Sequence, residues 1–333
     1  PEILLSREGV TQGCPLGMIL YGIALLPLGE DLRQHSPDAV QPWYADDNAF
    51  YARASVSAKL SKRLCEIGPS VGYFPEPDKF WGICPKRKEA AARAQMEAEG
   101  LNIKWSRGQR YVGGFVGSEK MRERWIAPKV EEWVAGIGKL AEVGRRYPQS
   151  AYVGLVHCLQ AEWQYVCRVE PEMGPYLAPV ENALRNVFIP ALLDLKRGDT
   201  INDGFRLLLA RGIKSGGLAI RNPVEVAARL HTASVDSAEL LVESLLSNGD
   251  LDCAAHLARV REAGAAMRKE RAEKDEEVVK NLAELGGAKV KKRLERMLWN
   301  GSWLSAIPDR MSGTVLTREE WLDNVYLRFG LQL

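Results

Sequence analysis

The sequence predicts an α+β fold in two parts, with strands confined to the first part. Residues 1 to about 117 alternate short β-type runs with segments whose apolar residues recur every three or four positions. After Gly117 almost every segment has helical composition and period. A chain of 333 residues with 46% hydrophobic content is long enough to build a core in each part.

The first element predicted is a helix that begins near Pro15, because proline is favoured in the first turn of a helix. Apolar residues then recur at helical spacing, and the helix should run to about Leu32. We expect it to bury the apolar face made by Leu16, Ile19, Leu20, Ile23 and Ala24.

A β-hairpin should follow this helix. Residues 40–44 and 49–52 are two short β-type runs, and the turn-forming residues Asp46, Asp47 and Asn48 lie between them. The pattern predicts a tight hairpin with both carboxylates at its tip.

The rest of the first part continues the mixture. A helix is predicted over 57–67, a strand over 80–84 and a helix over 89–99. A second hairpin should pair 110–112 with 115–116 through a turn at Gly113 and Gly114.

The second part is predicted to contain helices separated by Pro, Gly, Asn or Asp. We divide it into a helical domain over 118–250 and a helical region of open role over 251–333. The helices are expected at about 119–146, 149–168, 176–195, 201–211, 223–247, 251–285, 288–299 and 317–329.

Composition excludes some classes of site. The net charge is only +2, so a nucleic-acid site would need a local cluster of Lys and Arg. The 6 cysteines are scattered without a zinc-finger spacing, and no stretch approaches the roughly 20 apolar residues of a membrane span. An intracellular protein without a membrane partner is expected.

Asp46 and Asp47 are the residues best suited to chemistry. Mg²⁺ prefers a few open oxygen ligands, which adjacent carboxylates at a hairpin tip supply. Neighbouring residues of an extended chain point to opposite sides, so one carboxylate should dominate as ligand. An ordinary surface turn is the alternative for an isolated Asp-Asp pair.

Four segments in order resemble the reverse transcriptases of non-LTR retrotransposons. The segment from Ser6 to Leu16 is similar to motif B, Tyr44-Ala45-Asp46-Asp47 to motif C, the segment from Gly72 to Lys79 to motif D, and the segment from Tyr111 to Gly117 to motif E. The resemblance implies a partial polymerase palm over 1–117, followed by a thumb-like domain.

It also implies a role for each matching residue. Asp46 and Asp47 would be catalytic and bind Mg²⁺, or Mn²⁺ in its place, in a two-metal nucleotidyl transfer, and Lys79 would neutralise or protonate the pyrophosphate. Contacts to the nucleotide or template would come from Gln12, Gly13 and Pro15, and the primer grip from Tyr111, Gly113, Gly114 and Phe115. The implied partners are an RNA template, a DNA primer and a dNTP, in a nuclear parent protein.

The resemblance further implies parts that this sequence lacks, namely a third metal-binding Asp before motif B and the fingers. We therefore expect this polypeptide to be inactive by itself. The alternative is a vestigial or non-catalytic nucleic-acid-binding role, for which the most basic cluster is Lys289, Lys291, Lys292, Arg293 and Arg296. Oligomeric state, template and target site stay open.

Overall fold

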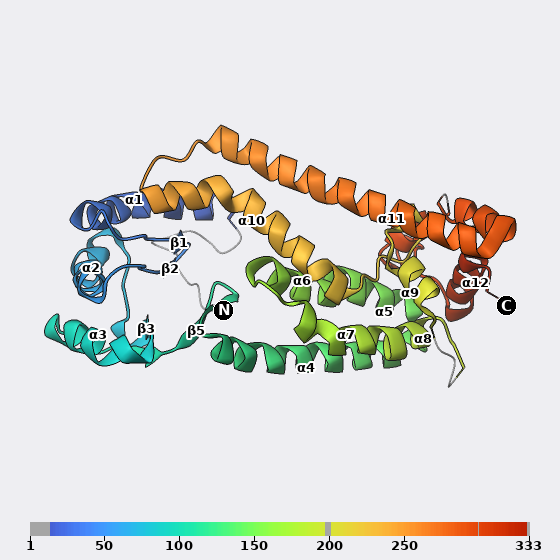
Figure 1. Cartoon of the computed structure of the whole chain (residues 1–333), viewed down its shortest axis with the longest axis horizontal. Coiled ribbons are helices and arrows are strands. Elements are labelled where there is room, and N and C mark those ends of the chain that lie inside the picture. Colours follow the sequence, from blue (N-terminus) through green and yellow to red (C-terminus); the bar gives the residue numbers. More distant parts are fainter. Residues whose placement is uncertain (1–13, 197–200, 299, 332–333) are drawn as a thin grey trace, which may run out of the picture. The chain divides into compact units, whose positions relative to one another are not determined.

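The computed structural model describes residues 14–196, 201–298 and 300–331. Within these ranges the chain is mostly helical (Figure 1). The strands form three small two-stranded sheets. The predicted α+β class is confirmed at this coarse level. The structure divides into two compact units. One comprises Pro1–Arg122 with Leu240–Asp252, and the other Glu123–Glu239 with Cys253–Leu333.

The first helix, α1 (Gly17–His35), buries a different face from the one predicted. Leu25, Leu28 and Leu32 point into the core of the first unit, whereas Ile19 and Ile23 are more than half exposed. The prediction of the face was wrong because α1 is apolar on more than one side, so that spacing alone cannot choose between them. The core is completed by α2 (Ala54–Ile67), through Leu60 and Leu64.

An ion pair joins these two helices. Arg63 donates from Nε and Nη2 to the two carboxylate oxygens of Asp31, at 2.9 and 2.7 Å. Because both side chains are about a third exposed, water screens the pair and it adds little to stability. The hydrophobic contacts of Leu28 and Leu60 therefore dominate the packing of α1 on α2.

Three strand pairs belong to the first unit. Two are antiparallel hairpins and one is parallel, joined through the helix α3 (Lys86–Ala98). The hairpins are β1 (Trp43–Tyr44) with β2 (Asp47–Asn48) and β5 (Gly108–Tyr111) with β6 (Gly114–Gly117), and the parallel pair is β3 (Trp81–Ile83) with β4 (Lys104–Ser106). Strand β4 was not predicted.

Helices make up the ordered structure of the second unit, and they follow the predicted order. The predicted helix 149–168 is observed as α5 (Pro148–Val153), a π-helical stretch and α6 (Gln160–Val169). The others are α4 (Glu119–Gly144), α7 (Ala178–Ala183), α8 (Ile189–Leu192), α9 (Asp203–Ala210), α10 (Pro223–Ser247), α11 (Cys253–Met297) and α12 (Arg318–Phe329). The last turns of α10 belong to the first unit.

The two predicted helices 251–285 and 288–299 form the single element α11, which is interrupted at Gly287. Gly287 has φ 68° and ψ −169°, a conformation open almost only to glycine. The predicted break therefore exists, as a kink without a loop.

One large core holds the second unit together. Trp163, Phe188, Leu192 and Trp321 are buried in it, and the indole N–H of Trp321 donates to the main-chain oxygen of Leu192 at 3.3 Å. Among the described residues no helix combines the length and the apolar character needed to cross a membrane.

Candidate functional site

The Asp46–Asp47 pair lies on the β1–β2 hairpin of the first unit. Tyr44 pairs with Asp47 and Trp43 with Asn48, so the two-residue turn is Ala45-Asp46. The predicted turn over Asp46, Asp47 and Asn48 is thus corrected: Asp46 is at the tip, and Asp47 already belongs to β2. An antiparallel bridge between Val40 and Tyr51 extends the hairpin.

Ala45 takes a positive φ of 54° to make this turn. A two-residue hairpin loop needs positive φ in its first position, because only such turns match the twist of the paired strands. An alanine there is strained by about 1–2 kcal/mol relative to ordinary backbone. The turn therefore presents Asp46 from a strained, well-defined position.

Both carboxylates are exposed and available for a ligand. Neither Asp46 nor Asp47 forms an ion pair or a side-chain hydrogen bond with any described residue. Two hard oxygen donors suit Mg²⁺, which is commonly held by one or two carboxylates together with phosphates and water. Over the same part of the chain, no group of three or more His, Cys, Asp or Glu residues comes together. The residues present can thus supply part of a metal site.

Three tyrosines interact with the segment that carries the two carboxylates. The Tyr73 hydroxyl donates to the main-chain oxygen of Asp46 at 3.0 Å and its ring packs edge-on against Trp43. Burial raises the pKa of Tyr73 to about 12, with further contributions from Tyr21, from the two Asp carboxylates and from Cys65. Tyr73 was not predicted as a site residue, although it lies in the segment from Gly72 to Lys79 that resembles motif D.

Tyr21 and Tyr111 complete this group. The pKa of Tyr21 is raised first by burial and then by the charge of Asp46, while that of Tyr111 is raised first by burial and then by Asp47. A raised pKa keeps both phenols neutral at ordinary pH. The predicted primer-grip residue Tyr111 is thus brought within electrostatic reach of the predicted metal ligand Asp47.

Several polar atoms near the hairpin are buried without a hydrogen-bond partner among the described residues. They are Nε1 of Trp43, Nδ2 of Asn48, the hydroxyl of Tyr111 and both amide atoms of Gln41. Such atoms cost free energy unless something satisfies them. This hairpin is the richest source of them in the first unit.

Lys79 is not brought to the carboxylates by any observed contact. Its ammonium pairs with Glu76 at 2.8 Å, and both side chains are mostly exposed. The role of Lys79 as a partner of the pyrophosphate stays a prediction.

The predicted primer-grip hairpin is present, with its turn moved by one residue. Tyr111 pairs with Gly114, so the turn is Val112-Gly113 and Gly114 belongs to β6. Both turn residues have positive φ, 44° and 78°. The predicted Gly113-Gly114 turn was wrong because positive φ is expected of glycine and is rare for a β-branched residue such as Val112.

The ring of Phe115 packs against Gly108, where a side chain would clash with it.

Of the predicted nucleotide or template contacts, Gln12 and Gly13 lie outside the described residues. Pro15 is exposed in the turn that precedes α1, where the Gly17 N–H donates to the Cys14 oxygen at 3.0 Å.

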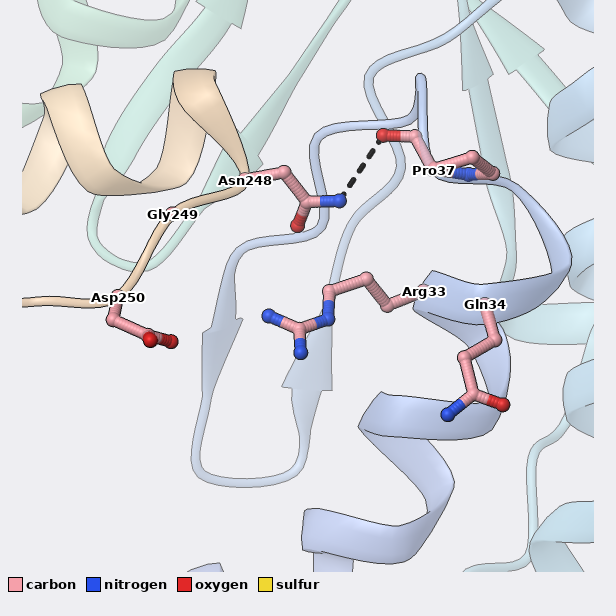
Figure 2. Close-up of a pocket in the computed structure, with 6 residues that line it drawn as sticks. All are labelled: Arg33, Gln34, Pro37, Asn248, Gly249 and Asp250. Carbon is pink, nitrogen blue, oxygen red and sulfur yellow. Dashed lines mark hydrogen bonds between the residues drawn. The ribbon is translucent and has the colours of Figure 1, made fainter.

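A separate depression of about 360 Å³ lies at the end of α1. Arg33, Gln34 and Pro37 line one side, and the residues after α10 line the other, as Figure 2 shows. Asn248 Nδ2 donates to the Pro37 oxygen at 3.2 Å across it. None of the predicted site residues lines this depression.

Comparison with known proteins identifies no relative. No protein-family model, no curated protein and no solved structure matches the chain.

Proposed function

We propose that the first unit is part of the catalytic palm of a retrotransposon RNA-directed DNA polymerase. In this proposal Asp46 and Asp47 take part in extending a DNA primer on an RNA template. The observation that carries it is the pair of exposed, unpaired carboxylates on the β1–β2 hairpin. The order of the four motif-like segments supports it.

The two carboxylates would have different duties. Asp46 is at the tip, and Tyr73 fixes its peptide group, so it is the better positioned ligand. Asp47 is in β2, with Tyr111 nearby, and would contribute the weaker contact. Bound Mg²⁺ would polarise the α-phosphate of the nucleotide and favour ionisation of the primer 3′-hydroxyl.

Having only two carboxylates also limits the polymerase activity expected of this chain. A polymerase site that positions both metal ions needs more oxygen ligands than Asp46 and Asp47 provide, and the described residues bring no third acid to them. We therefore expect the chain by itself to bind Mn²⁺ weakly and to extend no primer.

Metal binding can be tested directly by titrating the chain with Mn²⁺ and following the electron paramagnetic resonance signal of the free ion. Asp46→Asn should weaken binding by about tenfold, the effect of losing one charged ligand. Asp38→Asn is the matched control because Asp38 is also exposed in the first unit. Equal binding by the Asp46 variant and the wild type would contradict the proposed site.

Catalysis is tested in a longer polypeptide that contains this chain and extends oligo(dT) on poly(rA) with Mg²⁺. Asp46→Asn should abolish that extension, and Asp38→Asn should leave it unchanged. Extension that survives Asp46→Asn would sink the catalytic assignment.

A second candidate, nucleic-acid binding without catalysis, is favoured by the end of α11. After the kink at Gly287, the side chains of Lys289, Lys291, Lys292 and Arg296 are exposed. None of them forms an ion pair with a residue that the structure describes. Such cations can contact phosphates of a duplex.

Filter binding of a labelled duplex by the full chain tests this candidate. Retention should fall steeply between about 50 and about 200 mM salt, and changing Lys289, Lys291 and Lys292 to Gln should weaken it. The matched control changes Lys269, Lys274 and Lys280 to Gln on the same helix, where Lys269 and Lys274 are already paired with glutamates. Retention that is insensitive to salt and to the first triple change would exclude this candidate.

A further inference from the structure

A cavity of about 700 Å³ lies within the second unit and is lined by more positive than negative groups. It is formed by the 3₁₀ turn Ile213–Ser215, the middle of α11 and the 3₁₀ turn Ser302–Ser305. Its charged lining residues are Lys214, Arg221, Arg268, Arg271 and Asp275. Four cations therefore face one carboxylate.

The cations of this cavity lack ion-pair partners among the described residues. None of the four basic residues forms an ion pair with a carboxylate of the described chain, and the buried Nε of Arg271 has no hydrogen bond there. The guanidinium of Arg221 has one long contact, from Nη1 to the Ala210 oxygen at 3.5 Å. Asp275 accepts instead from the Gly212 N–H at 3.3 Å.

The positive charges of the cavity arginines also repel one another. The pKa of Arg221 is lowered to about 10, first by burial and then by the charges of Arg271 and Arg229, against the opposing effect of Asp275. Burial followed by Arg229 likewise lowers the pKa of Arg271. Arg211, next to Gly212, is only 4% exposed, and its Nε is also unpaired. Desolvated cations of this kind are costly unless an anion compensates them.

Two other buried arginines of the same unit have short hydrogen bonds within the protein, although Nε of Arg328 has no partner among the described residues. Arg206 makes two 2.7 Å contacts with the carboxylate of Glu181 and one with the Ile220 oxygen. Arg328 donates to the Asn300 side chain and to the Ile213 oxygen, at 2.6 and 2.9 Å. Unlike Arg206, the cavity residues Arg221 and Arg271 form no ion pair with a carboxylate of the described chain, although Asp275 lies in the same lining.

We propose that this cavity binds a phosphate group, held by Arg221 and Arg271. A guanidinium group can donate two parallel hydrogen bonds to two oxygens of one phosphate. Ser215 and Ser302 add hydroxyl donors to the cavity wall. The volume is in the range of small-molecule sites. The proposal does not depend on the function proposed for Asp46 and Asp47.

Calorimetric titration of the full chain with pyrophosphate tests the site, at constant ionic strength set with chloride. Wild type should bind, and Arg271→Gln should weaken binding by about tenfold. Arg268→Gln provides a second variant at an exposed position, and it should weaken binding in the same direction. Arg261→Gln, an equal charge change on α11 outside the cavity lining, should bind like wild type.

The source of the phosphate is resolved by two oligonucleotides that differ only in a 5′-phosphate or a 5′-hydroxyl. If the phosphate improves binding and Arg271→Gln removes the improvement, the site accepts the end of a nucleic-acid strand. If only pyrophosphate shows dependence on Arg271, the ligand is a small phosphorylated molecule. Binding of pyrophosphate that is absent, or equal in wild type, Arg271→Gln and Arg261→Gln, overturns the proposal.

Discussion

The hydroxyl of Tyr73 connects the motif D segment to the turn that carries Asp46. This single contact, 3.0 Å long, ties two segments that are far apart in the sequence. Motif spacing located Asp46 and Asp47 but could not reveal the tyrosines around them. Tyr21 and Tyr73 look like ordinary core residues in the sequence, since only tertiary packing exposes their pKa values to the charges of the hairpin.

Tyr73 should make stability depend on alkaline pH. Its pKa is raised in the folded chain, so its contribution is complete below the ordinary tyrosine pKa of 10.0 and is lost as the pH rises towards 12. Urea unfolding at several pH values should show a steeper decline above pH 10 for wild type than for Tyr73→Phe. Tyr51→Phe, which changes a 79% exposed tyrosine, should decline like wild type. If the unfolding free energies of wild type and Tyr73→Phe fall equally with pH, the raised pKa of Tyr73 is contradicted.

The turn residue Ala45 allows a second prediction at this scale. Ala45→Gly relieves about 1–2 kcal/mol of strain at φ 54° but gives the unfolded chain about 0.4–1 kcal/mol of extra conformational entropy. We expect a net gain of about 0.5–1 kcal/mol in the free energy of unfolding. Ala49→Gly, at a residue without positive φ, should instead lose stability by the entropic amount. A loss for both variants would show that Ala45 is unstrained.

At the scale of elements, α1 shows the limit of reading a periodic pattern. Leu16, Ile19 and Ile23 follow a helical spacing as well as Leu25, Leu28 and Leu32 do, and the structure buries the second set. The position of α1 in the sequence was predictable because Pro15 and the regular spacing of apolar residues are local signals. The choice of face depends on α2 and the hairpins, which lie elsewhere in the sequence.

The two faces of α1 should respond differently to truncation. Leu28→Ala removes a side chain that is 1% exposed and should cost about 2–5 kcal/mol of unfolding free energy. Leu20→Ala removes one that is 49% exposed and should cost less than about 1 kcal/mol. Chemical denaturation of both variants measures the two losses of unfolding free energy. Equal losses would mean that the face predicted from the sequence is buried after all.

At the scale of the whole molecule, the positions of the helices could be predicted from local signals in the sequence. The helices of the second unit follow caps, Pro and Gly punctuation that lie beside them in the sequence, such as the Thr317 capping box of α12. The first unit, by contrast, recruits Leu240–Asp252, the end of a helix whose earlier turns belong to the second. No local pattern signals that division. Contacts such as Asn248 with Pro37 arise only in the folded chain.

Separate cores predict separate unfolding transitions. Leu60 lies in a core of the first unit and Leu192 in that of the second, and both side chains are fully buried. Differential scanning calorimetry should show two heat-absorption peaks, because chains with two cores commonly depart from two-state behaviour. Leu60→Ala should lower one peak temperature by several degrees and Leu192→Ala the other, since each removes about 2–5 kcal/mol from one core. A single peak that both substitutions lower equally would show instead that the two cores unfold as one cooperative structure.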